Sequence, residues 1–433
     1  MTTKGALREY RRSVRALDAQ FDADIERYRK ADALIRVQDR EGNPVSGAQV
    51  SLSQKTHDFT FGCNALKLGQ MGAQNAAFEE SFARLFNLAT TTICWSVTET
   101  RQGFFRFSEA DGDMPRRPPL ERVIDFGRRR GIRVKAQPLM ADSWVPDWAS
   151  RDADTLRAQW VHFVEVVARR YASQVDVWDV VNEAMICPKR RPGFPLLDEQ
   201  YSYVDWCFEQ AARVFPKEHG VFELNEGSFV NWGEDAKTYE RLAQRLLDKG
   251  LPLESIGFQF HQFSGAEGLA HLRGEHTPVE QIMETYRSFE KLGVPLSITE
   301  ITLPSRLPGL SPEEGEEVQA EVAWNLYRLW FSRPNMSSII YWNFMDGKHW
   351  GNEGDCRGCL LDVNMREKPA YQALYQLINR RWRTDAQLET DAQGECCVRG
   401  FKGDYELTVD APNGHTVLEM GVHRDGDALT VTL

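Results

Sequence analysis

The chain has 433 residues, of which 42% are hydrophobic and 27% charged, so it is able to form a large core and does not indicate disorder. Its formal charge of −11 argues against a nucleic-acid-binding surface, and no uncharged apolar run is long enough for a transmembrane helix. The N-terminal stretch has no apolar segment of a secretion signal, and eight scattered cysteines are typical of reduced thiols. We therefore expect a cytoplasmic protein without a membrane partner.

The two ends of the chain predict accessory structure. Residues 1–34 are charged and amphipathic and predict an N-terminal helix, which could mediate assembly of a homo-oligomer. Residues 35–62 alternate apolar and polar side chains between turn signals, and residues 381–433 repeat this pattern. A single β-sandwich built from both ends would pair all these strands. Phe401 and Tyr405 could stack on a sugar there, although packing within the sandwich explains them equally well.

The middle of the chain, residues 63–380, alternates strand-like and helix-like stretches. The strand candidates are GIRVKAQPL, VDVWDVVNEA, HGVFELNE, SIGFQFHQ, PLSITEITLP and SSIIYWNFMD. Repeated β–α units predict a parallel sheet, and their number favours an α/β fold of the (β/α)8 TIM-barrel type over a doubly wound sheet. No glycine-rich phosphate loop follows any of these strands, which weakens a nucleotide-binding interpretation.

Several of these predicted strands end in polar residues. In residues 175–184 an apolar run ends at Asn182 and Glu183, although burial penalises the charged form of a carboxylate. In a TIM barrel the C-terminal strand ends meet at one rim, which carries the chemistry. We therefore expect one substrate site at this rim. The other polar strand ends are Asn225 and Glu226, Gln259 and His261, Glu300, and Trp342 and Asn343 with Asp346.

Two glutamates at one rim suit the cleavage of a glycosidic bond. One carboxyl must be protonated, so that it can deliver a proton to the leaving oxygen. The other must be ionised, so that it can attack the anomeric carbon or activate water. The pair helps to tune itself, because ionisation of one carboxyl raises the pKa of the other. Glu183 and Glu300 are the candidates for these two roles.

These residues resemble a known family. The stretch VDVWDVVNEA, with PLSITEITLP placing Glu300 117 positions after Glu183, resembles the family 10 glycoside hydrolases, best known as endo-β-1,4-xylanases. GFQFH at 257–261 and the closing LLDVNMREKPAY support the resemblance, which covers about residues 80–375. The resemblance implies a retaining mechanism without a cofactor, with Glu183 as the acid/base and Glu300 as the nucleophile.

The same resemblance implies the contacts around the sugar. Asn182 would hold the sugar 2-hydroxyl, and His261 would sit beside Glu300 and keep it ionised, with Gln259 nearby. Trp342 and Trp350 would form walls of the sugar site. The chain departs from the family in one of these contacts, because Ile301 and Thr302 follow Glu300 where an Asp normally orients the histidine.

Larger departures affect the glycone side. Family members carry a Glu-Asn…Lys-Trp segment after a Phe-Asn pair. Residues 86–95 read FNLATTTICW, so the pair is present but only Trp95 remains of the segment. The family's His-Thr-Leu-Val-Trp-His becomes QPLMAD, from Gln137 to Asp142. We therefore expect Gln137, Asp142 and residues 90–92 to meet a different or shorter glycone, with Asp142 able to accept from two neighbouring hydroxyls. A small β-glycoside or oligosaccharide is the expected substrate, and an ordinary endo-xylanase is the alternative.

Two other classes remain as alternatives. A non-catalytic carbohydrate-binding barrel would be expected if either glutamate were replaced, but both are present. A metal-dependent hydrolase could use His261, Asp142, Glu183 and Glu300 as ligands, but the HxH pair usual in barrel metal sites is missing from the sequence. The CxxC pair at 356–359 has no second pair at zinc-ribbon spacing. The sequence therefore predicts neither a metal nor a cofactor.

Overall fold

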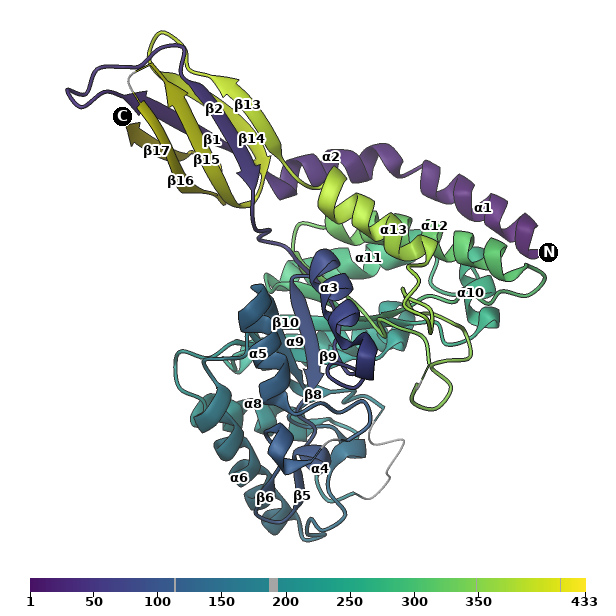
Figure 1. The fold of residues 1–433 in the computed structure, drawn as a ribbon. Coiled ribbons are helices and arrows are strands. Elements are labelled where there is room, and N and C mark those ends of the chain that lie inside the picture. The colour runs from purple at the N-terminus through teal and green to yellow at the C-terminus, as the bar shows by residue number, and fades with distance from the viewer. Residues whose placement is uncertain (113, 187–193, 348, 413) are drawn as a thin grey trace. The chain divides into compact units, whose positions relative to one another are not determined.

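The computed structural model describes the chain except residues 113, 187–193, 348 and 413 (Figure 1). The described residues form two compact units. The first consists of residues 1–15, 61–323 and 335–372, and the second of residues 16–60, 324–334 and 373–433. Seven described cysteines are free thiols, whereas Cys187 lies outside the described residues.

The first unit is built around a closed barrel of eight parallel strands, which confirms the predicted α/β TIM barrel. Neighbouring strands follow the order β10-β11-β12-β3-β4-β7-β8-β9. Their bounds are β3 Thr60–Asn64, β4 Leu88–Thr92, β7 Arg133–Gln137, β8 Val177–Asn182, β9 Val221–Glu226, β10 Ser255–His261, β11 Leu296–Thr302 and β12 Met336–Tyr341. The six strands predicted for the middle of the chain correspond to β7 through β12.

Helices connect consecutive barrel strands (Figure 1). Helix α6, Ala153–Tyr171, shows why they form: the Asp152 side chain caps it by accepting from the Thr155 N–H, and one face buries Trp160, Phe163 and Val167. The other connecting helices are α3 Asn75–Leu85, α4 Trp95–Thr98, α5 Leu120–Arg130, α8 Ser202–Val214, α9 Gly233–Asp248, α10 Gly265–Leu272, α11 Val279–Phe289 and α12 Pro312–Ser332, and α13 Pro369–Gln376 follows the last barrel strand. Within the described chain, none of the helices has the length and apolarity needed to cross a membrane.

A buried ionic group links three neighbouring strands inside the barrel. The Lys135 ammonium on β7 lies 2.8 Å from Asp179 Oδ1 on β8 and also contacts the Glu223 carboxylate on β9. Burial by itself would lower the pKa of Lys135, but these two carboxylates raise it above its ordinary value. Since removal of one partner would leave an uncompensated buried charge, the group fixes the strands whose ends carry Gln137 and Glu183.

Three predictions about elements need correction. The predicted N-terminal helix is two helices, α1 Thr3–Arg15 and α2 Asp18–Arg29, and strand β1 already begins at Lys30. Residues 60–62, predicted to belong to the accessory sandwich, lie in barrel strand β3, and every residue of that strand is buried. Strand β4, LATTT, was not predicted, because its three threonines do not give an apolar run.

The second unit contains two sheets of mostly antiparallel strands, formed from both ends of the chain as predicted (Figure 1). The sheets have the orders β14-β1-β17 and β13-β2-β15-β16, and they share one apolar core that includes Val50, Leu52 and Leu407. Their bounds are β1 Lys30–Gln38, β2 Gln49–Gln54, β13 Asp385–Glu389, β14 Glu395–Phe401, β15 Gly403–Ala411, β16 Gly414–Val422 and β17 Asp427–Thr432.

The aromatic residues considered for sugar binding lie in the interior of this second unit. Tyr405 and Phe401 are both buried, and the Tyr405 hydroxyl donates to the Phe401 carbonyl oxygen. Neither ring face is therefore available to stack on a sugar, which favours a structural role for both.

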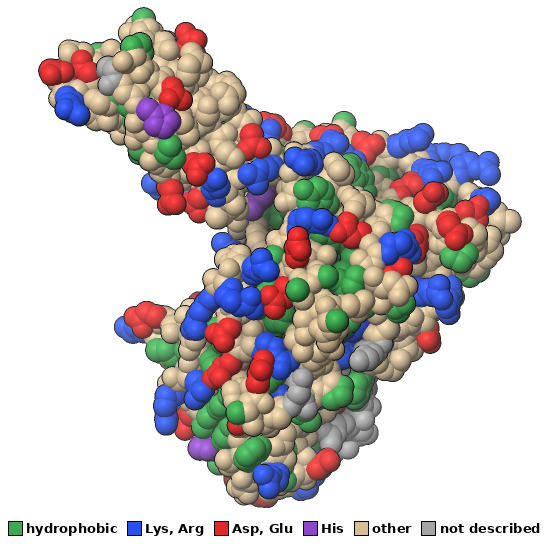
Figure 2. Space-filling view, in the orientation of Figure 1, with side chains coloured by type: hydrophobic (Ala, Val, Ile, Leu, Met, Phe, Trp, Pro, Cys, Tyr) green, Lys and Arg blue, Asp and Glu red, His purple; other side chains and the backbone are tan. Residues whose placement is uncertain are grey.

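On the face of the molecule shown in Figure 2, basic side chains are interspersed with acidic ones.

Candidate active site

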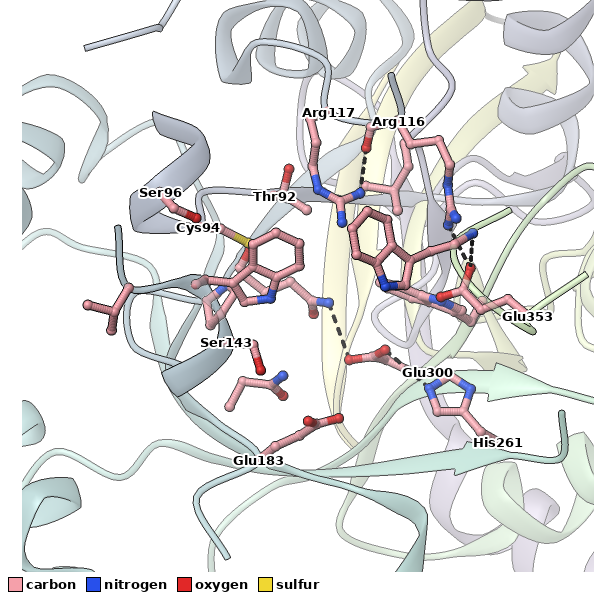
Figure 3. Close-up of a pocket in the computed structure, with 18 of the residues that line it drawn as sticks. Thr92, Cys94, Ser96, Arg116, Arg117, Ser143, Glu183, His261, Glu300 and Glu353 are labelled. Carbon is pink, nitrogen blue, oxygen red and sulfur yellow. Dashed lines mark hydrogen bonds and ion pairs between the residues drawn. The ribbon is translucent and has the colours of Figure 1, made fainter. Parts of the chain in front are cut away.

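A cavity of about 590 Å³ lies where β8, β10, β11 and β12 end, and it is the candidate active site (Figure 3). Its volume falls within the range of roughly 300–1,000 Å³ that is typical of small-molecule sites. Most of the predicted site residues contribute to its wall, so strand ends far apart in sequence do meet at one place. The predicted residues in the wall are Gln137, Asn182, Glu183, His261, Glu300, Trp342 and Trp350.

Glu300, on β11, is held by three nitrogen donors. Gln137 Nε2 and Asn225 Nδ2 donate to Glu300 Oε1 at 3.2 and 3.1 Å. His261 Nε2 lies 3.3 Å from the other carboxylate oxygen. Three contacts on one carboxylate fix the direction of its oxygens, so the geometry suits a group that must present an oxygen to a substrate atom.

Glu183 leaves the barrel wall immediately after β8. The strand itself is buried, whereas Glu183 is half-buried and adopts a φ of +56°. Few residues other than glycine take positive φ values, and such backbone strain concentrates at functional sites. The turn brings the carboxylate into the cavity wall, where Oε1 accepts from Gln259 Nε2 at 3.3 Å. This local geometry explains how an apolar strand can end in a glutamate.

Asn225 and Gln259, which were predicted to contact the substrate, contact the two glutamates instead. Both residues are buried, and neither belongs to the described lining of the cavity. Besides its bond to Glu300, Asn225 donates to Asn182 Oδ1 at 2.9 Å, and Gln259 donates to the same oxygen at 3.3 Å. Both amides are therefore placed to position the side chains that face the cavity.

Asp142 is not placed as predicted for a substrate contact. It is 2% exposed and does not belong to the described cavity wall, so it is not positioned to hold sugar hydroxyls there. The short 3-10 turn Asp142–Trp144 presents the next two residues, Ser143 and Trp144, to the cavity instead. Of the threonines at 90–92, Thr92 lines the cavity.

Thr302 contacts His261 where the sequence lacks the expected aspartate. Thr302 Oγ1 lies 2.9 Å from His261 Nδ1, on the opposite side of the ring from Glu300. With the hydroxyl donating to Nδ1, a neutral imidazole carries its proton on Nε2 and can donate to Glu300. The hydroxyl is thus placed to orient the ring without adding a negative charge.

We expect Thr302→Val to lower kcat/KM about 5- to 30-fold, because loss of one orienting hydrogen bond costs about 1–2 kcal/mol. Thr302→Ser keeps the hydroxyl and should retain most of the activity. Steady-state kinetics on the best substrate would compare the two variants. Equal kcat/KM values for the valine and serine variants would contradict this role.

Glu226, the second polar residue at the end of β9, has a different environment. It is completely buried, and its Oε1 accepts from the Met185 N–H at 2.9 Å. Burial, with a smaller contribution from the nearby Glu183, raises the pKa of Glu226 from its ordinary 4.5 to about 8. This pKa favours the protonated, neutral form of Glu226 at neutral pH.

Protonated Glu226 predicts a pH dependence of stability. Because the folded-state pKa is raised, its stabilising contribution is complete below pH 4.5 and is lost as the pH rises through about 8. We expect Glu226→Gln, which resembles the protonated acid, to remove this part of the dependence, on the order of a few kcal/mol. Chemical denaturation of both proteins at pH 5 and pH 8 would measure it. An identical loss of stability in both proteins would contradict the assignment.

Sequence reasoning missed Arg116, Glu353 and Trp144, which surround predicted residues on another side of the cavity. Arg116 donates to Glu353 Oε2 at 2.8 Å and to Asn343 Oδ1 at 2.9 Å, and Trp342 Nε1 donates to Glu353 Oε1 at 3.2 Å. The Trp144 and Trp350 rings lie 6.0 Å apart. Most of these residues lie in loops, where no periodicity of the sequence marks a side chain that faces the cavity.

Trp95, the residue that remains from the family's glycone segment, is not part of the described cavity wall. It is 2% exposed, and its Nε1 donates to Glu99 Oε2 at 2.8 Å. Cys94 and Ser96, on either side of it, line the cavity instead. The similarity at Trp95 therefore supports local packing and does not preserve a sugar contact.

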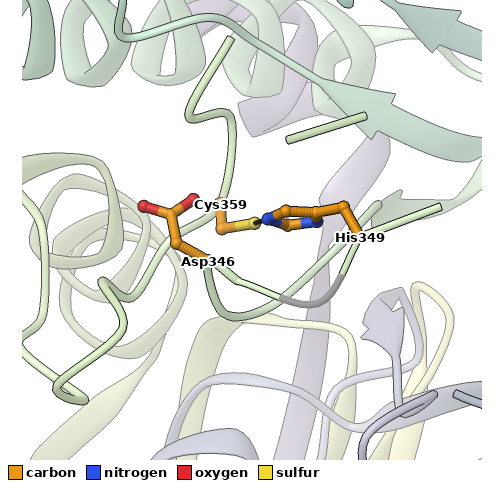
Figure 4. A group of neighbouring side chains, drawn as sticks. All are labelled: Asp346, His349 and Cys359. Carbon is orange, nitrogen blue, oxygen red and sulfur yellow. Dashed lines mark hydrogen bonds between the residues drawn. The ribbon is translucent and has the colours of Figure 1, made fainter. Parts of the chain in front are cut away.

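Asp346, His349 and Cys359 form a second group whose ligand-type atoms all lie within 4.8 Å of one another (Figure 4). Asp346 already forms an ion pair with the Lys368 ammonium at 2.5 Å, and His349 Nε2 accepts from the Gly347 N–H. Burial raises the pKa of the Cys359 thiol well above its ordinary value and lowers the pKa of His349 to about 4. A neutral thiol beside an ammonium is a poor ligand set for a cation, so we interpret the group as a support for its loop.

Comparison with known proteins places this architecture among carbohydrate-active enzymes. Residues 51–377 match the model of "Glycosyl hydrolase family 10". The chain is 25% identical over 425 residues to the anti-sigma-I factor RsgI6 of Acetivibrio thermocellus, which covers 95% of this chain and 49% of that protein. It is 25% identical over 359 residues to endo-1,4-beta-xylanase C of Paenibacillus barcinonensis, covering 72% of this chain and 31% of that protein. The chain thus spans about half or less of the length of these two relatives.

Solved structures share the same barrel. The native xylanase 10B of Thermotoga maritima aligns with a TM-score of 0.62 at 21% identity, over 75% of this chain and 96% of the xylanase. The xylanase 10B of Thermotoga petrophila RKU-1, in complex with xylobiose, aligns with a TM-score of 0.61 at 20% identity, over 75% and 95% of the two chains. At this level of identity, the likeness establishes the fold.

Proposed function

Because the chain belongs to glycosyl hydrolase family 10, we propose that it hydrolyses β-glycosides with retention of configuration, through Glu183 and Glu300. The observation that carries this proposal is the environment of Glu300. Three nitrogen donors hold its carboxylate in the same cavity wall that contains Glu183. One carboxyl group prepared for attack and a second one within the same cavity are the two groups that the reaction needs.

The proposed reaction has two steps. Glu300 attacks the anomeric carbon while the bond to the leaving oxygen breaks and Glu183 transfers its proton to that oxygen. This step leaves the sugar bound to Glu300 as an ester. Ionised Glu183 then takes a proton from water, the water oxygen attacks the anomeric carbon, and the Glu300 carboxylate departs. Two displacements at the same carbon restore the original configuration.

We propose a small β-glycoside or oligosaccharide as the substrate. The cavity volume of about 590 Å³ suits a compact ligand. The Glu, Asn and Lys that would grip a second sugar have no counterparts in residues 86–95. Each charge-assisted contact of this kind is worth roughly 1.5–3 kcal/mol, so loss of two or three weakens binding of a polymer by orders of magnitude.

An endo-β-1,4-xylanase is the second candidate function, and the barrel shared with xylanases, one of them solved with xylobiose, favours it. The two candidates are separated by kcat/KM on xylan and xylo-oligosaccharides compared with a panel of short aryl β-glycosides. Efficient random cleavage of xylan would establish the second candidate. Binding of sugars without hydrolysis of any substrate would instead indicate a non-catalytic carbohydrate-binding barrel.

A further inference from the structure

The long connection between β4 and α5 delivers two consecutive arginines to the cavity. Arg116 and Arg117 both line it, together with Cys94 and Ser96 from the same connection (Figure 3). This connection follows the segment in which the family-like polar residues are missing. The cavity wall thus contains two cations that the retaining mechanism does not use.

The charge of Arg116 is already compensated. Its Nη2 lies 2.8 Å from Glu353 Oε2, and both side chains are almost completely buried, with 8% and 14% exposed. Asn343 joins the pair by donating to the same Glu353 oxygen at 3.0 Å. Arg116 and Glu353 therefore form a direct ion pair in the cavity wall, whereas Glu353 acts on Arg117 only from a longer distance.

The charge of Arg117 has no such compensation. Among the residues that the structure describes, no carboxylate forms an ion pair with it, and its one hydrogen bond is donated by Nη1 to the Arg116 carbonyl oxygen at 2.8 Å. Its guanidinium carbon lies 4.9 Å from the ring centre of Trp144 and 5.8 Å from that of Trp350. The side chain is half-buried, and burial lowers the pKa of Arg117.

This arrangement suits the binding of an anion. A partly desolvated cation without a counter-ion is unfavourable, and an anionic ligand would provide the missing partner. The guanidinium is planar and can donate two parallel hydrogen bonds to a carboxylate. The Trp144 and Trp350 rings next to it offer apolar surface for the rest of a ligand. In Figure 3 Arg117 extends from the side of the cavity opposite Glu183, so an anion there would be kept away from that glutamate.

We propose that Arg117 binds a carboxylate of the substrate, so that the preferred substrates are small β-glycosides that carry a carboxylate. The inference rests on the proposed glycosidase function and narrows it to a substrate class. The carboxylate can belong to the glycone, as in a β-glucuronide or β-galacturonide, or to the aglycone. Both sources present the same group to the guanidinium.

The experiment compares kcat/KM for 4-nitrophenyl β-glucuronide and β-galacturonide with the values for the corresponding glucoside, galactoside and xyloside. A 4-carboxyphenyl β-xyloside, measured against phenyl β-xyloside, tests the aglycone as the source. The variants are Arg117→Gln, which removes the charge, and Arg117→Lys, which retains it without the planar fork. Arg40→Gln is the matched control, because it removes an exposed arginine from the second unit.

We expect the wild-type protein to prefer one of the anionic substrates, and Arg117→Gln to lower the ratio of anionic to neutral kcat/KM roughly 10- to 100-fold. The ratio for Arg117→Lys should lie between those of the wild-type protein and Arg117→Gln, and Arg40→Gln should keep the wild-type ratio. If neutral glycosides are hydrolysed at least as well and the ratio is the same in Arg117→Gln, the inference is wrong while the proposed function stands.

A direct binding measurement decides the inference if no glycoside is hydrolysed. Calorimetry with glucuronate, galacturonate and xylose would then be performed on the wild-type protein and on Arg117→Gln. Tighter binding of a uronate that is lost in Arg117→Gln supports the anion site even though the proposed function has failed. Uronate binding that is no tighter than xylose binding, or is unaffected by the substitution, contradicts it.

Discussion

Glu300→Ala is expected to abolish turnover. Removal of a nucleophile typically costs several orders of magnitude in rate, and the remaining glutamate cannot replace it. In the structure the substitution also leaves Gln137, Asn225 and His261 without the carboxylate that they share. Steady-state kinetics on the best aryl glycoside would measure the loss.

Small anions provide a sharper test of the same variant. Azide fits the space vacated by the carboxylate and attacks the anomeric carbon once, so partial recovery of activity with an inverted glycosyl azide is expected. Glu280→Ala, on the exposed face of α11, is the matched control and should retain activity. If Glu300→Ala were as active as the wild-type protein, the assignment of the two glutamates would be wrong.

Glu183→Ala should have a large effect that depends on the leaving group. Without the general acid, glycosides of poor leaving groups must expel an unprotonated alkoxide, so most of their rate is lost. Strongly acidic phenols depart as phenolates without needing a proton, so their aryl glycosides should retain far more of the rate of the first step. The measurement is a plot of log kcat/KM against the pKa of the leaving phenol, for the wild-type protein and the variant.

The slope of that plot identifies the role of Glu183. We expect a steeper negative slope in Glu183→Ala than in the wild-type protein, because no proton offsets the charge that develops on the leaving oxygen. A parallel loss on every substrate would argue that Glu183 positions the sugar and does not donate the proton. Glu183→Gln retains the hydrogen-bonding shape and would show whether that shape alone is sufficient.

The barrel and the centre of its site could be predicted because the underlying signals are local. Strands β7 through β12 are apolar runs, and polar residues at their ends, such as Glu183 and Glu300, contrast with those runs. Parallel strands of a barrel bring such ends to one rim, so topology converts separate local signals into one site. Strand β4 gave no such contrast, since the burial of its threonines depends on neighbours that only the fold supplies.

The outer wall of the site could not be predicted, because loops determine it. Arg116 and Arg117 follow no periodic pattern, and only the path of the chain between β4 and α5 brings them to the cavity. The same limitation explains Asp142, which the sequence aligned with the family's glycone contacts. A short 3-10 turn buries it and exposes Ser143 and Trp144 to the cavity instead.

Trapping the covalent intermediate tests the central claim most directly. The protein would be incubated with a 2-deoxy-2-fluoro analogue of its best substrate that bears a dinitrophenyl leaving group. The fluorine slows both steps, and the activated leaving group speeds the first step again, so the covalent intermediate accumulates. Mass spectrometry of the intact protein and its peptides is then expected to show one added sugar, attached to Glu300. An unlabelled protein that is still inhibited reversibly, or a label on a residue other than Glu300, would contradict the account.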